Sequence, residues 1–339
     1  MATFPKMAES WRIARLEPAK HIAHCVLDTD TYNEVDDQFA LTYAFLAKES
    51  LELEAVYAAP FHNSRSTGPE DGMVKSFEEI HRVLERLGGV PEGFVFEGSR
   101  KWLKDSDGPV ESPAAQDLIN RAMARPDDAE PLYVLTIGAP TNVASALLME
   151  PELVKKIVVV WLGGQPLEWP TAKEFNLFQD VKSSQVLFDS GVPLMQVPCT
   201  NVAEHLRVSL PFLDAYLKGK SAIGDYLTEI VHHYTNDPYC WSKVIWDIST
   251  VAWIVNAGWF NTTLTQSPVL HDDFRYSHDA NRHLFRVATH LSRDVIFRDL
   301  FNKIGAFGKK GVATASTPSS GGISLRNLPK IKYERAGVD

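Results

Sequence analysis

Short apolar runs alternate with amphipathic stretches over the first 200 residues, and this alternation restricts the fold more than any other feature of the chain. The apolar runs typical of buried strands span residues 23–27, 51–57, 132–137, 157–162 and 195–197. The helical patterns between and after them span residues 36–48, 72–87, 142–149 and 180–189, the last with Asp180 at its N-cap. Strands that alternate with helices predict an α/β fold with a mostly parallel open sheet and helices on both faces.

The second half of the chain has a different pattern. Residues 209–256 are predicted to be mainly helical, with short strands at 267–270 and 282–287 and a closing helix at 294–303. No linker divides the sequence, so residues 1–307 are predicted to form a single α/β domain with a helical C-terminal part. From residue 308 the chain is rich in Ser, Thr and Gly, which predicts a flexible tail over residues 308–339.

The charge pattern limits the partners of the chain. The formal net charge is −9 and the basic residues are scattered, whereas nucleic-acid binders carry a basic patch. We therefore expect no nucleic-acid partner. A small neutral or cationic ligand, or an anion bound through a metal, suits this charge better.

The sequence also indicates in which cellular compartment the protein is expected. No apolar run approaches the roughly 20 residues that cross a bilayer, so we expect no membrane partner. Residues 1–20 lack the apolar core of a secretory signal. Three widely spaced cysteines, Cys25, Cys199 and Cys240, match no metal or disulfide spacing and favour a reducing, cytoplasmic setting.

An acidic cluster follows the first predicted strand. Asp28, Asp30, Asp36 and Asp37 lie within ten residues, and Glu34 adds a fifth carboxylate. Ligands of open α/β sheets bind beyond the carboxyl ends of the strands, which is where this cluster falls. First-turn acids that favour a helix dipole account for one or two of these residues. Carboxylates packed together repel one another unless a cation or protons intervene, so the cluster predicts a divalent metal site. Hard oxygen ligands favour calcium or magnesium over zinc.

Two hydrolase families place carboxylates at such a strand end. Asp28-Thr29-Asp30-Thr31 resembles the Asp-x-Asp-x-Thr opening of the haloacid dehalogenase-like phosphatases, with Asp28 as the nucleophile. Those enzymes also have a late acidic pair beyond another strand. This chain has no such pair after a clear strand, so the phosphatase is the remote alternative.

The nucleoside hydrolase family fits better, because its motifs recur here in its order over roughly residues 23–305. The motifs that resemble it are Asp28-Thr29-Asp30, Asp36-Asp37-Gln38-Phe39-Ala40-Leu41, Gly138-Ala139-Pro140-Thr141-Asn142, Leu162-Gly163-Gly164, Glu174-Phe175-Asn176 and Trp246-Asp247. The resemblance implies the α/β fold of that family. It also implies calcium-dependent hydrolysis of the N-glycosidic bond of ribonucleosides or related ribosides, and a homodimer or homotetramer.

The resemblance assigns roles to individual residues. The calcium ligands would be Asp30, Asp37, the main-chain carbonyl of Ile137 and Asp247, and Asp30 would also act as general base. Asp28 would lie behind Asp30, in the second shell. The substrate-binding residues would be Asp36, Asn63, Leu162, Glu174, Asn176 and Trp246.

Two departures from the family pattern bear on the reaction. Trp246 stands where well-known members have a histidine that protonates the leaving base, and an indole can stack on a base but cannot protonate it. Residues 58–63 replace an Ala-Gly-Asn turn, and Asn63 is the residue expected to take over its role. The missing histidine leaves open a second class of function, a non-catalytic homologue that binds metal and ribose.

Overall fold

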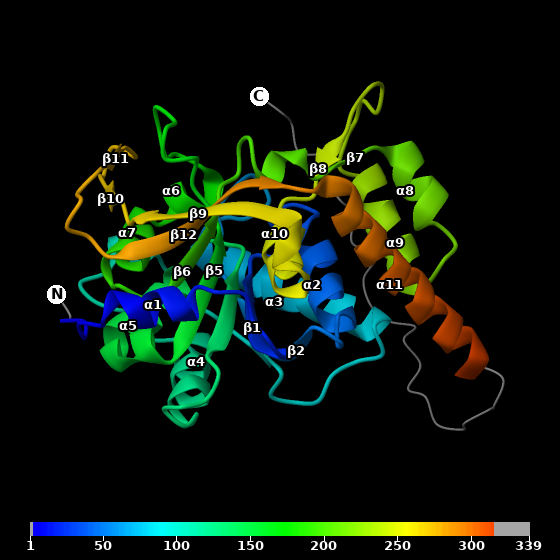
Figure 1. Ribbon diagram of the computed structural model, residues 1–339. Coiled ribbons are helices and arrows are strands. Elements are labelled where there is room, and N and C mark those ends of the chain that lie inside the picture. Colours follow the sequence, from blue (N-terminus) through cyan, green and yellow to red (C-terminus); the bar gives the residue numbers. More distant parts are fainter. Residues whose placement is uncertain (1–2, 315–339) are drawn as a thin grey trace.

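The computed structural model describes residues 3–314, and a mixed sheet of eight strands forms its centre (Figure 1). The strand order is β3-β2-β1-β4-β5-β6-β12-β9. Every neighbouring pair is parallel except the last, in which β9 runs antiparallel to β12. The strands are β1 (Ala23–Thr29), β2 (Leu51–Ala58), β3 (Val95–Phe96), β4 (Leu132–Thr136), β5 (Ile157–Leu162), β6 (Leu194–Val197), β9 (Phe260–Gln266) and β12 (Leu284–Leu291).

Helices cover both faces of this sheet, as the alternation predicted (Figure 1). One face carries α2 (Asp37–Leu46), α3 (Pro69–Arg86), α8 (Leu210–Tyr216), α9 (Ala222–His232), α10 (Ile248–Val255) and α11 (Arg293–Thr314). The other face carries α4 (Pro113–Met123), α5 (Thr141–Met149) and α7 (Val181–Asp189), while α1 (Glu9–Arg15) packs against β12. The predicted fold class, including the helical C-terminal part, is confirmed.

The central strands are apolar throughout because both of their faces are buried. In β1, Cys25 and Leu27 belong to the apolar layer beneath α2 and α10, whereas Val26 belongs to the layer beneath α4 and α5. In β4, Val134 and Leu135 divide in the same way. This two-sided burial is typical of parallel strands and explains why the runs lack a polar alternation.

Four details differ from the sequence-based expectation. The edge strand β9 was not predicted, because five of the seven residues in its sequence FNTTLTQ are polar and only Phe260 is buried. Of the strand expected at 267–270, only β10 (Val269–Leu270) forms, paired with β11 (Tyr276–Ser277). Helices α1 and α4 were also missed. Asp180 does not cap α7 with its side chain but accepts hydrogen bonds from the N–H groups of Leu103 and Lys104.

The C-terminal helix extends beyond its predicted end. Helix α11 continues to Thr314, six residues past the position at which the tail was expected to begin. The rest of that predicted tail, residues 315–339, lies outside the described residues. Within the described part of the chain, no helix combines the length and the apolar character needed to cross a membrane.

Candidate active site

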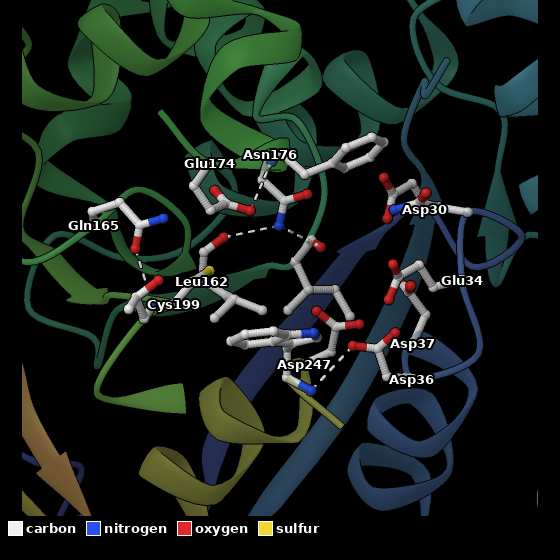
Figure 2. A pocket seen from close by; sticks show the side chains of 15 residues that line it. Asp30, Glu34, Asp36, Asp37, Leu162, Gln165, Glu174, Asn176, Cys199 and Asp247 are labelled. Atoms are coloured by element: carbon white, nitrogen blue, oxygen red, sulfur yellow. Dashed lines mark hydrogen bonds between the residues drawn. The ribbon is translucent and has the colours of Figure 1, made fainter. Parts of the chain in front are cut away.

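A pocket of about 310 Å³ opens at the carboxyl ends of the central strands. Asp30 follows β1 directly, Ile137 follows β4, Leu162 ends β5 and Cys199 lies two residues beyond β6. Trp246 and Asp247, just before α10, complete the wall. Figure 2 shows Asp30, Glu34 and Asp37 on one side of this pocket and Gln165 and Cys199 on the other. The structure therefore brings strand ends and one distant helix start into a single cavity.

Three carboxylates converge in this pocket from two helices. One carboxylate oxygen from each of Asp36, Asp37 and Asp247 lies within 4.8 Å of the other two, and all three side chains are buried. Asp37 begins α2 and Asp247 immediately precedes α10, and these two helices pack together. Their contact places the late aspartate beside the early pair. Such a group of hard oxygen ligands suits calcium or magnesium.

Asp30 is the least satisfied polar side chain in the pocket. It is 1% exposed, and neither of its carboxylate oxygens has a hydrogen-bond partner within the described structure. Burial raises the pKa of Asp30 well above its ordinary value, and the charges of Asp37, Asp36 and Glu34 raise it further. A buried carboxylate that lacks donors is unfavourable unless a cation neutralises it. The unpartnered oxygens of Asp30 therefore fit a site built for a cation.

Two further acids of the pocket, Asp37 and Asp247, are also shifted toward the protonated form. Burial raises the pKa of Asp37 to about 7, with a further contribution from Asp36 and an opposing hydrogen bond from Thr29. Burial, followed by the charges of Asp36, Asp37 and Asp30, raises the pKa of Asp247 well above its ordinary range. Desolvation and like-charge repulsion act in the same direction here. The ionised carboxylates of the cluster therefore repel one another, and a bound divalent cation would offset this repulsion.

Asp28 lies behind the pocket rather than in its wall. One of its oxygens accepts a hydrogen bond from Nδ2 of Asn142 at 2.8 Å, and the other has no partner in the described structure. Burial raises the pKa of Asp28 to about 7, against the opposing hydrogen bond from Asn142. Asp28 does not line the pocket, and its role behind Asp30 stays a prediction.

A buried lysine that the sequence did not single out offsets part of the negative charge. Lys243 Nζ pairs with Glu34 and lies 3.7 Å from Oδ1 of Asp36. The hydroxyl of Tyr234 donates to Glu34 at 3.1 Å. Burial alone would raise the pKa of Glu34, but Lys243, Tyr234 and Arg65 together lower it. No local signal marks these partners, because Lys243 and Glu34 are 209 residues apart in the sequence.

Glu174 and Asn176 fix the far wall of the pocket at the start of α6 (Phe175–Gln179). Glu174 accepts hydrogen bonds from the N–H groups of Gly164 at 2.8 Å and Asn176 at 3.0 Å, so its carboxylate caps α6. The amide of Asn176 donates to the carbonyls of Ile137 and Leu162, each at 3.0 Å. One side chain thereby joins the ends of β4 and β5 and sets the direction of both carbonyls.

Gly164 permits this wall to turn. Its φ is 70°, in the left-handed region, and a Cβ placed there would lie 2.5 Å from the hydroxyl oxygen of Tyr276. Any other residue would meet both backbone strain and a steric clash. A glycine at position 164, two residues beyond the end of β5, is therefore a geometric requirement of the pocket wall.

Most of the predicted site residues line the pocket, and Asn63 and Asp28 do not. Asn63 Nδ2 instead donates to Oδ1 of Asn33 at 2.6 Å, so it holds the loop of residues 31–35 from outside. Six further residues line the pocket without having been assigned a role there: Asn33, Glu34, Gln165, Phe175, Cys199 and Thr200. The expectation that ligands bind beyond the carboxyl ends of the strands does select the segments around Gln165 and Cys199. It does not show which of their side chains point into the pocket.

Comparisons with known proteins agree with this geometry. The model of the inosine-uridine preferring nucleoside hydrolase family matches residues 25–298. The pyrimidine-specific ribonucleoside hydrolase RihA of Salmonella typhimurium is 28% identical over 255 residues, which cover 67% of this chain and 78% of RihA. A purine-preferring ribonucleoside hydrolase from Gardnerella vaginalis superimposes with a TM-score of 0.68 at 18% identity, over 85% of this chain and all of that one. The plant nucleoside hydrolase PpNRh1 gives a TM-score of 0.66 at 18% identity, over 84% and 99% of the two chains.

Proposed function

Because this chain belongs to the inosine-uridine preferring nucleoside hydrolase family, we propose that it hydrolyses the N-glycosidic bond of ribonucleosides or related ribosides with calcium as its resident cation. The products are ribose and the free base. The observation that carries the proposal is the buried, unpartnered carboxylate of Asp30, in the same pocket as the converging carboxylates of Asp36, Asp37 and Asp247. Because the chain belongs to this family, the alternative of a haloacid dehalogenase-like phosphatase is dropped.

The proposed calcium ligands are Asp30, Asp37, Asp247 and the main-chain carbonyl of Ile137. The convergence of Asp37 and Asp247, and the absence of donors to Asp30 in the described structure, support this set. Asp36 joins the same cluster and is proposed to contact the ribose 2′-hydroxyl region or to orient the ligands. When bound, calcium fixes the ribose diol and the attacking water and lowers the pKa of that water.

The remaining steps fall to side chains of this chain. Asp30 takes the proton from the attacking water as general base. The surrounding carboxylates stabilise the positive charge that develops on the sugar ring as the bond breaks. Glu174 and Asn176 are proposed to hydrogen-bond the ribose hydroxyls from the opposite wall, where the hydrogen bonds of Asn176 to two carbonyls already orient its amide. Leu162 and Trp246 complete the contacts to sugar and base.

A calcium-controlled assay tests this function. Purified protein is incubated with a panel of ribonucleosides, with calcium or with chelator, and free ribose is measured as reducing sugar. Ribose release that needs calcium is the expected result. If no riboside in the panel releases ribose while calorimetry shows calcium binding, the alternative of a non-catalytic metal- and ribose-binding homologue is favoured. Trp246, which stands where the family pattern led us to expect a proton-donating histidine, is the observation behind that alternative.

Replacing Trp246 with alanine is expected to weaken substrate binding more than it slows the chemical step. Trp246 lines the pocket beside Asp247, and loss of one aromatic stacking partner costs roughly 1 kcal/mol, or about a fivefold rise in KM. We expect kcat to change less than KM, measured with the best riboside of the panel. Trp246→Phe is the matched control and should retain most of the affinity. A large fall in kcat at unchanged KM would contradict the stacking role.

The setting of the enzyme is part of the proposal. We propose a homodimer or homotetramer, which light scattering coupled to size exclusion would measure. We also propose a role in the salvage of purines and pyrimidines in the cytoplasm. The three free cysteines, two of them buried, support a reducing compartment.

A further inference from the structure

Resting on the proposed function, we propose that Arg65 is a positioning residue for the pocket. Its guanidinium holds residues 31–35, called the spacer segment from here on, in one shape. Because Asp30 directly precedes the spacer segment and Asp37 follows it by two residues, the shape of the segment sets how the two carboxylates meet. Arg65 itself lies outside the described lining of the pocket, so it acts through the segment that it holds.

Two side chains from the loop after β2 bind the main chain of the spacer segment. Nη1 of Arg65 donates to the carbonyl of Tyr32 at 3.3 Å and to that of Glu34 at 2.9 Å. Nδ2 of Asn63 donates to the carbonyl of Asn33, which lies between them in the chain, at 3.2 Å. Three successive carbonyls are therefore bound from the same neighbouring loop. Since Arg65 binds two of them through one rigid planar group, it fixes their relative direction.

Two tyrosine rings hold the guanidinium in place. The Cζ atom of Arg65 lies 5.8 Å from the centre of the Tyr32 ring and 5.4 Å from that of Tyr234, distances at which a cation is attracted to a ring face. The hydroxyl of Tyr234 donates to Oε1 of Glu34 at 3.1 Å, and Lys243 pairs with the same carboxylate. Glu34 is thus held at its main chain by Arg65 and at its side chain by residues from the second half of the chain.

The loop that carries Arg65 is anchored by contacts that do not use the Arg65 side chain. The N–H of Arg65 donates to Oδ1 of Asn63 at 2.8 Å, and its carbonyl accepts a hydrogen bond from Nζ of Lys75 at 2.8 Å. Lys75 pairs in turn with Asp71, one turn earlier in α3. A substitution at position 65 therefore removes contacts with the spacer segment and leaves its own loop attached to α3.

A fixed spacer segment lowers the free-energy cost of binding a cation between its two ends. If the segment were loose, part of the binding free energy would go into ordering it. The charge of Arg65 acts in the opposite direction, because a nearby positive charge repels a cation. Positioning by Arg65 and repulsion by its charge therefore change the calcium affinity with opposite signs, and variants can separate them.

Calorimetry of calcium binding to the metal-free protein is the test, and Arg65→Lys is the decisive variant. Lysine keeps the positive charge but lacks the planar fork of arginine, so it cannot keep both carbonyls and both ring contacts. We expect the calcium dissociation constant to rise roughly tenfold, the effect of losing one hydrogen bond from a charged donor. Arg65→Met should raise it too, but by less, because loss of the positive charge partly offsets the loss of positioning.

Arg293→Lys is the matched control. Nε of Arg293 donates to the carbonyl of Arg207 at 2.9 Å, and its Cζ lies 5.0 Å and 4.9 Å from the ring centres of Phe212 and Phe297, outside the described lining of the pocket. This variant should lower the unfolding temperature of the metal-free protein about as much as Arg65→Lys and leave the calcium affinity unchanged. Ribose release gives a second readout, since the calcium concentration for half-maximal activity should rise in Arg65→Lys by the same factor as the dissociation constant.

The outcomes separate this inference from the proposed function. Unchanged or tighter calcium binding by Arg65→Lys or Arg65→Met would overturn the inference and leave the proposed function standing. An equal loss of affinity in Arg293→Lys would overturn it as well. If the unmodified protein binds calcium and releases no ribose, the proposed hydrolysis fails, while weaker binding by Arg65→Lys still upholds the inference. If the unmodified protein binds no calcium, both are overturned.

Discussion

Replacing Asp30 with asparagine is expected to lower kcat by about 10³-fold or more while the protein stays folded. The amide has the shape of the carboxylate but cannot accept the proton of the attacking water. It also removes a negative ligand from the proposed calcium site. Since neither oxygen of Asp30 has a partner in the described structure, the substitution breaks no hydrogen bond there. Without calcium, it relieves repulsion with Asp36 and Asp37, so the midpoint of thermal unfolding should rise rather than fall.

The matched control is Asp117→Asn, which changes the same functional group away from the pocket. Asp117 accepts hydrogen bonds from the hydroxyl of Tyr57 at 2.7 Å and from Arg121 at 3.1 Å. This control should lose stability and keep turnover, the reverse of Asp30→Asn. Ribose release and thermal unfolding of both variants, with and without calcium, are the measurements. Near-full activity of Asp30→Asn would show that another group removes the proton.

Calcium is expected to stabilise the protein strongly at about pH 8 and only weakly at about pH 5. The pKa values of Asp28 and Asp37 are raised from 3.8 to about 7 in the folded chain. In the unfolded chain these acids lose their protons near their ordinary pKa, so between about pH 4 and pH 7 the folded state binds more protons. The metal-free protein therefore loses stability as pH rises through this window. Calcium requires ionised ligands and competes with these protons, so its effect grows as pH rises.

Thermal unfolding with calcium or with chelator measures this difference. Free calcium at 100 times its dissociation constant contributes about 2.7 kcal/mol, a shift of roughly 4 °C for a chain of this size. Asp247→Asn is the informative variant, because it removes one carboxylate from the Asp36, Asp37 and Asp247 group. It should lose most of the shift at the higher pH. Equal calcium shifts at both pH values would contradict protonation of the metal-free cluster.

The layered fold and the family could both be predicted from the sequence alone. Strand runs such as 132–137 and 157–162 are readable because two-sided burial demands continuous apolar residues, a property of each segment by itself. The acidic cluster from Asp28 to Asp37 could also be predicted from the sequence, because its carboxylates are neighbours in the chain and follow a strand. The ordered motifs then indicated which later residues join them.

The way in which these residues meet depends on the packing of the whole chain. The packing of α2 against α10 brings Asp247 to Asp36 and Asp37, and it brings the Trp246 N–H to Asp36 across 210 residues. The pairing of Lys243 with Glu34, and the turn of Asn63 toward Asn33 and away from the pocket, leave no local trace in the sequence. The mostly polar edge strand β9 forms because β12 offers it an edge with which to pair. The hydrophobic periodicity of a segment indicates whether that segment is buried or exposed. Which residues contact one another depends on strand order and helix packing, and these depend on the whole chain.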